Sequence, residues 1–199
     1  FMAVVVKAAA LGSFLRVMYV GFGGLTEVWV GLIWVLSASS MILGNIVALR
    51  QRSVKRMLAY SSIAHAGYIL MGFLVFRTTG GGEAVIFYIL AYSLMTVASF
   101  GTVLLVTAGT DGQYFSDDIE SFKGMGWRSP FLGFCMVVAL LSLGGMPPLA
   151  GFMGKFYLFS ATVQGGYVGL AIIAALNSVV SLYNYLRVIV EMYFQDLSA

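Results

Sequence analysis

A long apolar stretch that contains a lysine and a pair of prolines constrains the fold more than any other feature of this chain. It spans about residues 130–164 and reads PFLGFCMVVALLSLGGMPPLAGFMGKFYLFSATVQ. As one continuous helix it would reach roughly 50 Å, well beyond a hydrocarbon core of about 30 Å. Pro147 and Pro148 cannot donate backbone hydrogen bonds. We therefore predict one membrane helix that is broken near these prolines, with Gly151 at the hinge and Lys155 just past the break.

The composition of the chain is that of a membrane protein. Hydrophobic residues make up 60% of its 199 residues and charged residues only 10%, whereas a soluble domain carries about 25% charged residues. The net charge of +3 is small, so no nucleic-acid partner is needed to explain it. These features predict an all-α polytopic membrane protein that forms a single transmembrane domain over residues 1–199, embedded in a lipid bilayer.

Six apolar segments can be distinguished, and we predict a transmembrane helix in each. The connections are mostly short, which places neighbouring helices side by side and antiparallel. Because the chain starts inside one apolar segment and ends soon after another, we expect it to be part of a larger subunit. The segments span about residues 1–21, 28–49, 56–76, 84–108, 130–164 and 167–194.

One strongly basic loop predicts the orientation of the helices. Arg50, Arg52, Lys55 and Arg56 fall between the second and third segments, and the positive-inside rule places such a loop on the cytoplasmic side or its organellar equivalent. Parity then places the polar stretch 109–129 and the C-terminal end on the same side. We expect this stretch to lie along the surface with a short amphipathic helix, and its acidic residues to face water or a partner.

Two lysines lie deep inside apolar segments. A charged side chain within the membrane is costly and indicates a functional site by default. Lys7 lies roughly 20 Å along the helix from the end of its segment near Gly21, which is too deep for comfortable snorkelling. We predict that Lys7 and Lys155 are buried, protonatable groups. For Lys7 the alternative is a lysine that snorkels from a truncated helix.

The third segment carries a histidine near its centre, on a polar stripe. Ser61, His65 and Tyr68 have i, i+4, i+7 spacing and share one helical face, and Tyr60 and Ser62 flank it. An unperturbed imidazole titrates near pH 6.5, which suits proton transfer. The alternative is a histidine that hydrogen-bonds a neighbouring helix for packing.

The buried basic groups suggest a proton relay. Lys55 lies about 15 Å along the helix from His65, so water would have to bridge these two residues. The alternative for Lys55 is that it only belongs to the basic cluster at a helix end. We predict a relay of Lys7, Lys55, His65 and Lys155, joined by water. Because charging one member disfavours charging the next, an electrostatic event at one end can drive protons stepwise along it.

Three stretches of the sequence resemble a known family. They read GNIVALRQRSVKRMLAYSSIAHAGYILMGFL, LLSLGGMPPLAGFMGKFYLF and LNSVVSLYNYLRVIVEMYF. Together they resemble the antiporter-like membrane subunits of respiratory complex I, of the NuoN type. The resemblance covers essentially the whole chain and aligns it with the eighth to the thirteenth of fourteen helices, in the C-terminal half of such a subunit.

The resemblance implies a fold of two inverted five-helix repeats, each with one broken helix, and a role in proton translocation. By position, Lys7 matches the lysine of the eighth helix and Lys155 matches the lysine of the broken twelfth helix. Lys55 and His65 match polar positions of the segment between them. The supporting polar or hinge positions are Tyr60, Ser61, Ser62, Pro147, Pro148 and Gly151.

The resemblance also implies where the redox chemistry takes place. The chain is expected to be a non-redox subunit of an NADH:quinone oxidoreductase, with no metal or cofactor site and no self-contained catalytic site of its own. FMN, iron–sulfur clusters and quinone are expected in partner subunits. The expected partners are the other membrane-arm subunits, including further antiporter-like ones. The expected location is an energy-transducing membrane, a bacterial inner membrane first, with the mitochondrial inner and thylakoid membranes as alternatives.

Two other functions are consistent with the sequence. One is a cation/proton antiporter subunit of an Mrp-type or membrane-bound hydrogenase complex, since these share similar stretches. The other is a non-conducting structural subunit, in which replacing Lys7 or Lys155 by an apolar residue would leave pumping intact.

Overall fold

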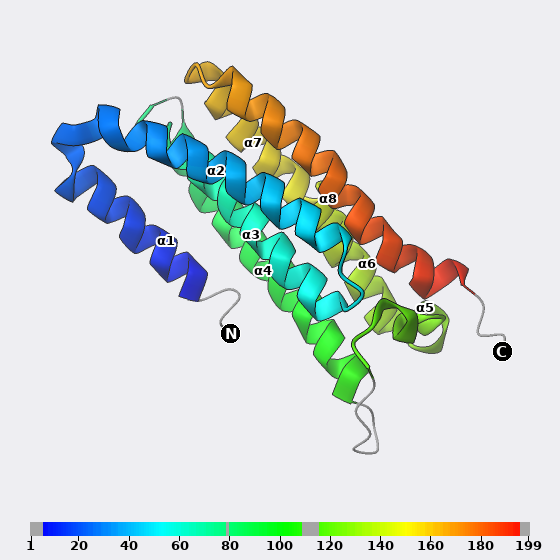
Figure 1. Cartoon of the computed structure of the whole chain (residues 1–199). Coiled ribbons are helices and arrows are strands. Elements are labelled where there is room, and N and C mark those ends of the chain that lie inside the picture. The colour runs from blue at the N-terminus through cyan, green and yellow to red at the C-terminus, as the bar shows by residue number, and fades with distance from the viewer. Residues whose placement is uncertain (1–5, 79, 109–115, 196–199) are drawn as a thin grey trace.

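The helices of the chain form an elongated bundle in which most of them run side by side (Figure 1). The computed structural model describes residues 6–78, 80–108 and 116–195, without the side chains of residues 26 and 27. Within this part every regular element is helical, so the all-α prediction is confirmed there. The elements are α1 (Lys7–Arg16), a π-helical turn (Val17–Gly21), a 3-10 turn (Gly23–Leu25), α2 (Thr26–Leu49), α3 (Val54–Phe73), α4 (Gly81–Ala108), a 3-10 turn (Ile119–Phe122), α5 (Met125–Arg128), α6 (Pro130–Gly144), α7 (Ala150–Gln164) and α8 (Val168–Phe194).

Three of the described helices are long and apolar enough to cross a membrane by themselves. Their apolar spans are Val28–Leu49 in α2, Gly81–Ala108 in α4 and Val168–Phe194 in α8. The others fall short for different reasons. The α3 helix carries polar residues along its buried face, α6 and α7 have 15 residues each, and the described part of α1 has 10.

The basic loop and the polar stretch after α4 meet at one end of the bundle. The Val54 backbone N–H donates to the Asp117 carbonyl at 2.8 Å, and the Ile119 N–H donates to the Arg52 carbonyl at 2.8 Å. Ser53 caps α3 by accepting a bond from the Arg56 N–H at 3.2 Å. The stretch forms two short helical turns instead of one amphipathic helix; residues 109–115 of the prediction lie outside the described residues.

The C-terminal part of α8 reaches the same end. The Trp127 indole N–H donates to the Tyr193 carbonyl at 3.1 Å. Arg187 donates to the Leu49 carbonyl at 3.0 Å and also to the Gln51 carbonyl. The loop after α2, the polar stretch and the end of α8 therefore lie at one end of the bundle, as parity predicts. Which side of a membrane this end faces stays a prediction.

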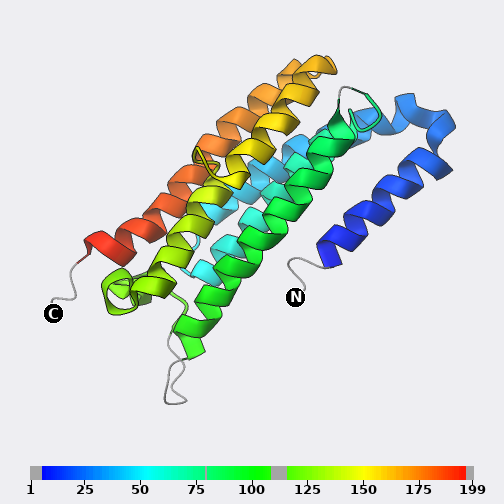
Figure 2. The same ribbon diagram turned by 180° about the vertical axis from the view of Figure 1, so that it is seen from behind.

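The predicted helix break is present and separates α6 from α7, which follow one another between α4 and α8 (Figure 2). Gly145 ends α6 with φ +85°, a conformation that favours glycine. Its N–H and that of Met146 both donate to the Leu141 carbonyl at 3.0 Å. Pro147 and Pro148 then occupy the connection, and α7 begins at Ala150.

The start of α7 passes very close to the end of α6. A Cβ atom on Gly151 would lie 1.7 Å from the Ser142 carbonyl oxygen, so this approach requires glycine. The Gly151 N–H donates to the Ser142 hydroxyl at 3.1 Å. Gly151 therefore lies at the hinge in the position that the sequence predicts.

Candidate functional site

Lys155 is buried in the break between α6 and α7, with 3% of its surface exposed. Its ammonium donates three hydrogen bonds, to the Leu143 and Gly144 carbonyls and to the Ser178 hydroxyl, each at 3.0 Å. The face of the Tyr68 ring lies beside it, with Nζ 5.1 Å from the ring centroid. Such a distance is within the range of a cation–π interaction.

The broken helix explains how a lysine is accommodated at this depth. The last carbonyls of a helix have no partner within the helix and form the negative end of its dipole. The Leu143 and Gly144 carbonyls belong to this end of α6. The negative potential of these carbonyls stabilises the Lys155 ammonium. The break therefore supplies the polar surroundings that a charged side chain needs inside an apolar bundle.

His65 is buried at the centre of a cluster of tyrosines, with 1% of its surface exposed. Its Nδ1 lies 2.6 Å from the Tyr88 hydroxyl and its Nε2 lies 3.1 Å from the Tyr185 hydroxyl. A neutral imidazole has one donor and one acceptor nitrogen, so one tyrosine donates to the ring and the other accepts from it. Both ring nitrogens are therefore connected to groups that can also exchange protons.

The predicted stripe on α3 contributes to this cluster. Ser61 and the Tyr185 hydroxyl are hydrogen-bonded to each other. The Tyr68 ring lies beside His65, with centroids 5.9 Å apart, and it is the same ring that faces the Lys155 ammonium. Tyr68 thus contacts both basic groups, although His65 and Lys155 share no direct hydrogen bond in this structure.

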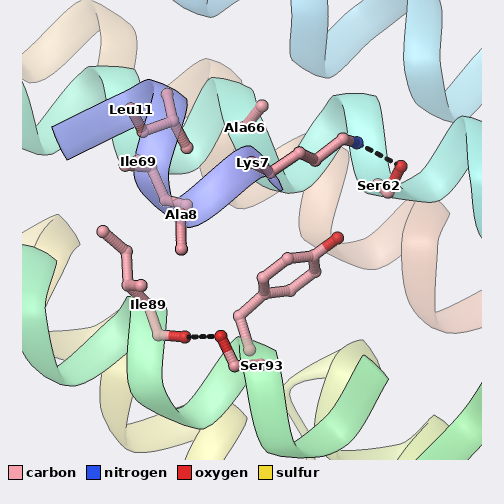
Figure 3. Close-up of a pocket in the computed structure, with 9 residues that line it drawn as sticks. Lys7, Ala8, Leu11, Ser62, Ala66, Ile69, Ile89 and Ser93 are labelled. Carbon is pink, nitrogen blue, oxygen red and sulfur yellow. Dashed lines mark hydrogen bonds between the residues drawn. The ribbon is translucent and has the colours of Figure 1, made fainter. Parts of the chain in front are cut away.

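Lys7 points from α1 toward α3 and donates to the Ser62 hydroxyl at 2.5 Å (Figure 3). Lys7 is half-buried, and a small cavity lies beside it. The prediction that Lys7 is buried is therefore not met, because the described part of α1 has no buried residue and packs little against the other helices. The bond to Ser62 places the ammonium at a polar group of α3, and its role as a protonatable site stays a prediction.

The structure separates two of the sequence-predicted residues from this network. Lys55 lies half-exposed on the first turn of α3, about 15 Å along the helix from His65. The Tyr60 side chain is 36% exposed and turns away from the buried stripe. Pro147 and Pro148 shape the break between α6 and α7 but are exposed in this chain.

Residues of α4 and α8 complete the site, and the sequence interpretation missed them. Tyr88 and Ser178 bind His65 and Lys155 from the next helix along the chain, and Tyr185 binds His65 from 120 positions away. On α8 the buried or half-buried polar residues share one face, and Ser181 donates to the Asn45 side chain at 2.8 Å. The available signal was the spacing of polar residues in an otherwise apolar segment; this face carries Asn177, Ser178, Ser181, Asn184 and Tyr185.

Comparison with known proteins matches nearly the whole chain to one family. The family described as "NADH:quinone oxidoreductase/Mrp antiporter, TM" matches residues 1–181. NADH-quinone oxidoreductase subunit N of Trichlorobacter lovleyi is 48% identical over 195 residues, which are 98% of this chain and 39% of the relative. NAD(P)H-quinone oxidoreductase subunit 2 of Synechocystis is 42% identical over 196 residues, 98% of this chain and 37% of the relative. The chain thus spans about 39% of the length of the first of these relatives.

Solved structures agree with this match. A chain of respiratory complex I from Thermus thermophilus with bound aureothin is 38% identical, with a TM-score of 0.72 over 83% of this chain and 36% of that chain. A chain of the Mrp complex from Dietzia has a TM-score of 0.84 over 94% of this chain and 34% of that chain. Its identity is 24%, so this second likeness concerns the fold alone.

Proposed function

Because this chain belongs to the family of antiporter-like membrane proteins of NADH:quinone oxidoreductases and Mrp antiporters, we propose that it is part of a proton-translocating subunit of an NADH:quinone oxidoreductase. The observation that carries the proposal is the buried Lys155 ammonium, held by the carbonyls of a broken helix. A lysine in such a place is able to release and regain a proton without leaving its polar surroundings.

The proposed mechanism moves one proton at a time between three polar sites. Lys7 with Ser62, His65 with its two tyrosines, and Lys155 with Ser178 are the stations. A proton that arrives at one site raises the energy of a charge at the next, so occupancy of the sites is coupled. Water and hydroxyl groups carry the proton between them. The sequence also predicts Lys55 as a fourth member of the relay, and further water molecules would have to connect it to His65.

The same proposal assigns the membrane topology. Six passes are formed by α1 with its π-helical turn, α2, α3, α4, the α6–α7 pair and α8. The end that holds the basic loop faces the cytoplasm or its organellar equivalent. Electron transfer through FMN, iron–sulfur clusters and quinone takes place in other subunits. The chain contacts further membrane-arm subunits, in a bacterial inner membrane or a corresponding energy-transducing membrane.

The test is proton pumping by the intact parent complex with the substitution Lys155→Ala. Vesicles that contain the complex are supplied with NADH and quinone, and proton uptake is recorded together with the electron-transfer rate. Loss of most of the pumping in a fully assembled complex supports the proposal. Wild-type rates with an unchanged proton-to-electron ratio would instead assign the chain a structural role.

The second candidate is a cation/proton antiporter subunit, which the family description and the fold likeness to the Mrp complex both allow. The sequence favours the oxidoreductase, since identity is 48% to a subunit N and 24% to the Mrp chain. Sodium dependence of transport in the same vesicles separates the two, because only the antiporter requires Na⁺.

A further inference from the structure

The buried face of α4 carries hydroxyl groups that the three polar sites do not use. Tyr92, Thr96, Ser99 and Thr102 are all at most 5% exposed. Ser99 and Thr102 each donate to the backbone carbonyl four residues earlier, at 2.9 Å. Within the described part of the chain, the Tyr92 and Thr96 hydroxyls instead form no hydrogen bond of normal geometry, although the Tyr92 hydroxyl lies near those of Thr96 and Ser62.

Two buried hydroxyls without a partner require an explanation. Buried polar groups in folded proteins are almost always paired with protein or with ordered water, because an unpaired group loses its hydration without compensation. Threonine in a helix readily donates to its own backbone, as Thr102 does. That Thr96 does not do so suggests that its hydroxyl is oriented toward another partner.

Two small cavities lie where that partner would be. One is lined by Ser62, His65, Tyr92 and Thr96 among others. The other shares Ser62 and Tyr92 and extends to Lys7 (Figure 3). Each has a volume of about 10 Å³, close to the smallest space in which one water molecule fits.

A few polar groups in the walls favour water over an empty space. A buried water typically makes about three hydrogen bonds to groups that would otherwise be unsatisfied. The first cavity offers the hydroxyls of Tyr92, Thr96 and Ser62 and the His65 ring. The second offers Ser62, Tyr92 and the Lys7 ammonium. Both cavities are lined mostly by apolar surface, but each also carries these polar groups, which a fully apolar, empty cavity lacks.

We propose that each cavity holds a water molecule and that Tyr92 and Thr96 bind these waters, which completes a proton path from Lys7 to His65. This inference rests on the proposed function. In each step a hydroxyl or water oxygen accepts a proton from one neighbour and passes a different proton to the next. One charge thus moves between the two basic groups, while only bonds to hydrogen form and break and no bond between heavier atoms changes. Tyr92 and Thr96 hold these waters within hydrogen-bonding distance of the neighbouring groups on the path.

The experiment compares two nearly isosteric substitutions on the same helix. Thr96→Val removes the unpaired hydroxyl, and Thr102→Val removes an equally buried hydroxyl that is already bonded to its own helix. Both are introduced into the intact parent complex, and proton pumping, electron transfer and the melting temperature are measured. Thr96→Ser serves as the rescue, because it restores a hydroxyl without the methyl group.

The expected result is a selective loss. Thr96→Val should lower the pumping rate about fivefold, the factor that corresponds to one hydrogen bond of about 1 kcal/mol in the rate-limiting step. Thr102→Val should stay near the wild-type rate and Thr96→Ser should recover most of the loss. Tyr92→Phe should show a loss similar to that of Thr96→Val, without a lower melting temperature.

The opposite result would overturn the inference. If the cavities are dry, Thr96→Val and Tyr92→Phe pump at wild-type rates and the valine variant is equally stable or more stable, since an unpaired hydroxyl has been removed. Lys155→Ala is measured in the same series to separate the two proposals. If only Lys155→Ala loses pumping, the relay stands and the water path fails; if it too retains wild-type pumping, the proposed function fails.

Discussion

The Lys155 ammonium lies directly beside Gly145, the residue whose left-handed backbone ends α6. A Cβ atom on Gly145 would fall 3.3 Å from Nζ and 3.0 Å from Cδ of the lysine. The same residue therefore stops the helix, leaves its last carbonyls free and makes room for the side chain that they bind. The break and the charge form a single structural unit.

The first prediction concerns this unit. Gly145→Ala adds a methyl group against Lys155 and places an alanine at φ +85°, which costs about 1–2 kcal/mol for the backbone alone. We expect a lower melting temperature of the complex and a clear loss of proton pumping. Thermal unfolding and vesicle pumping measure the two effects.

Gly166→Ala is the matched control for that variant. Gly166 has φ +87°, but a Cβ atom there would meet no other atom within 4 Å. It should show a similar loss of stability without the loss of pumping. Equal pumping defects in both variants would mean that backbone strain, and not the contact with Lys155, is responsible.

The second prediction concerns the hinge. Gly151→Ala would place its Cβ atom 1.7 Å from the Ser142 carbonyl oxygen, so α6 and α7 would have to move apart. We expect a large destabilisation, about 2–4 kcal/mol by comparison with other overpacked cores, and reduced amounts of assembled complex. Gly101→Ala is the control, since a Cβ atom there meets nothing within 4 Å. Normal assembly of the Gly151 variant would show that the two helices do not need this close approach.

The third prediction concerns the hydroxyl that joins His65 to α8. Tyr185→Phe removes the bond to His65 Nε2 and the bond to Ser61 while the ring stays in place. We expect pumping to fall by about fivefold, because only the bond to His65 lies on the proposed relay and one such bond is worth about 1 kcal/mol; the pH profile of pumping should also shift. Tyr183→Phe, on the same helix but 61% exposed, should behave like the wild type. A profile that is identical in the two variants would argue against a role for Tyr185 at the histidine.

Local chemistry explains which parts of the site could be read from the sequence. The prolines and glycines around residue 147 are unfavourable in a helix whatever surrounds them, so the break and Gly151 were predictable. The face shared by Ser61 and His65 follows from helical spacing alone. The placement of these elements agrees with the structure, whereas the roles of the residues in proton transfer stay predictions.

The partners of those residues depend on packing between helices. His65 binds Tyr88 on the next helix, α4, and Tyr185 on the distant helix α8, 23 and 120 positions away in the chain. The short connection predicts that α3 and α4 are neighbours, but no local pattern specifies which of their side chains meet or that α8 joins them. Tyr60 illustrates the same limit, because spacing alone could not decide whether a residue at the edge of the stripe faces the core or the outside.

The last prediction tests the one relay member that the structure sets apart. Lys55 lies at a half-exposed helix end, about 15 Å along α3 from His65, whereas Lys7 bonds to Ser62 beside the two cavities. Lys55→Ala should therefore reduce pumping much less than Lys7→Ala, measured as the proton-to-electron ratio in vesicles that contain equal amounts of assembled complex. Its effect should also weaken at high salt, because a charge near the surface is screened by ions. If Lys55→Ala instead abolishes pumping at any ionic strength, a water chain must extend from the basic loop to His65, and Lys55 would join the relay as the sequence predicts.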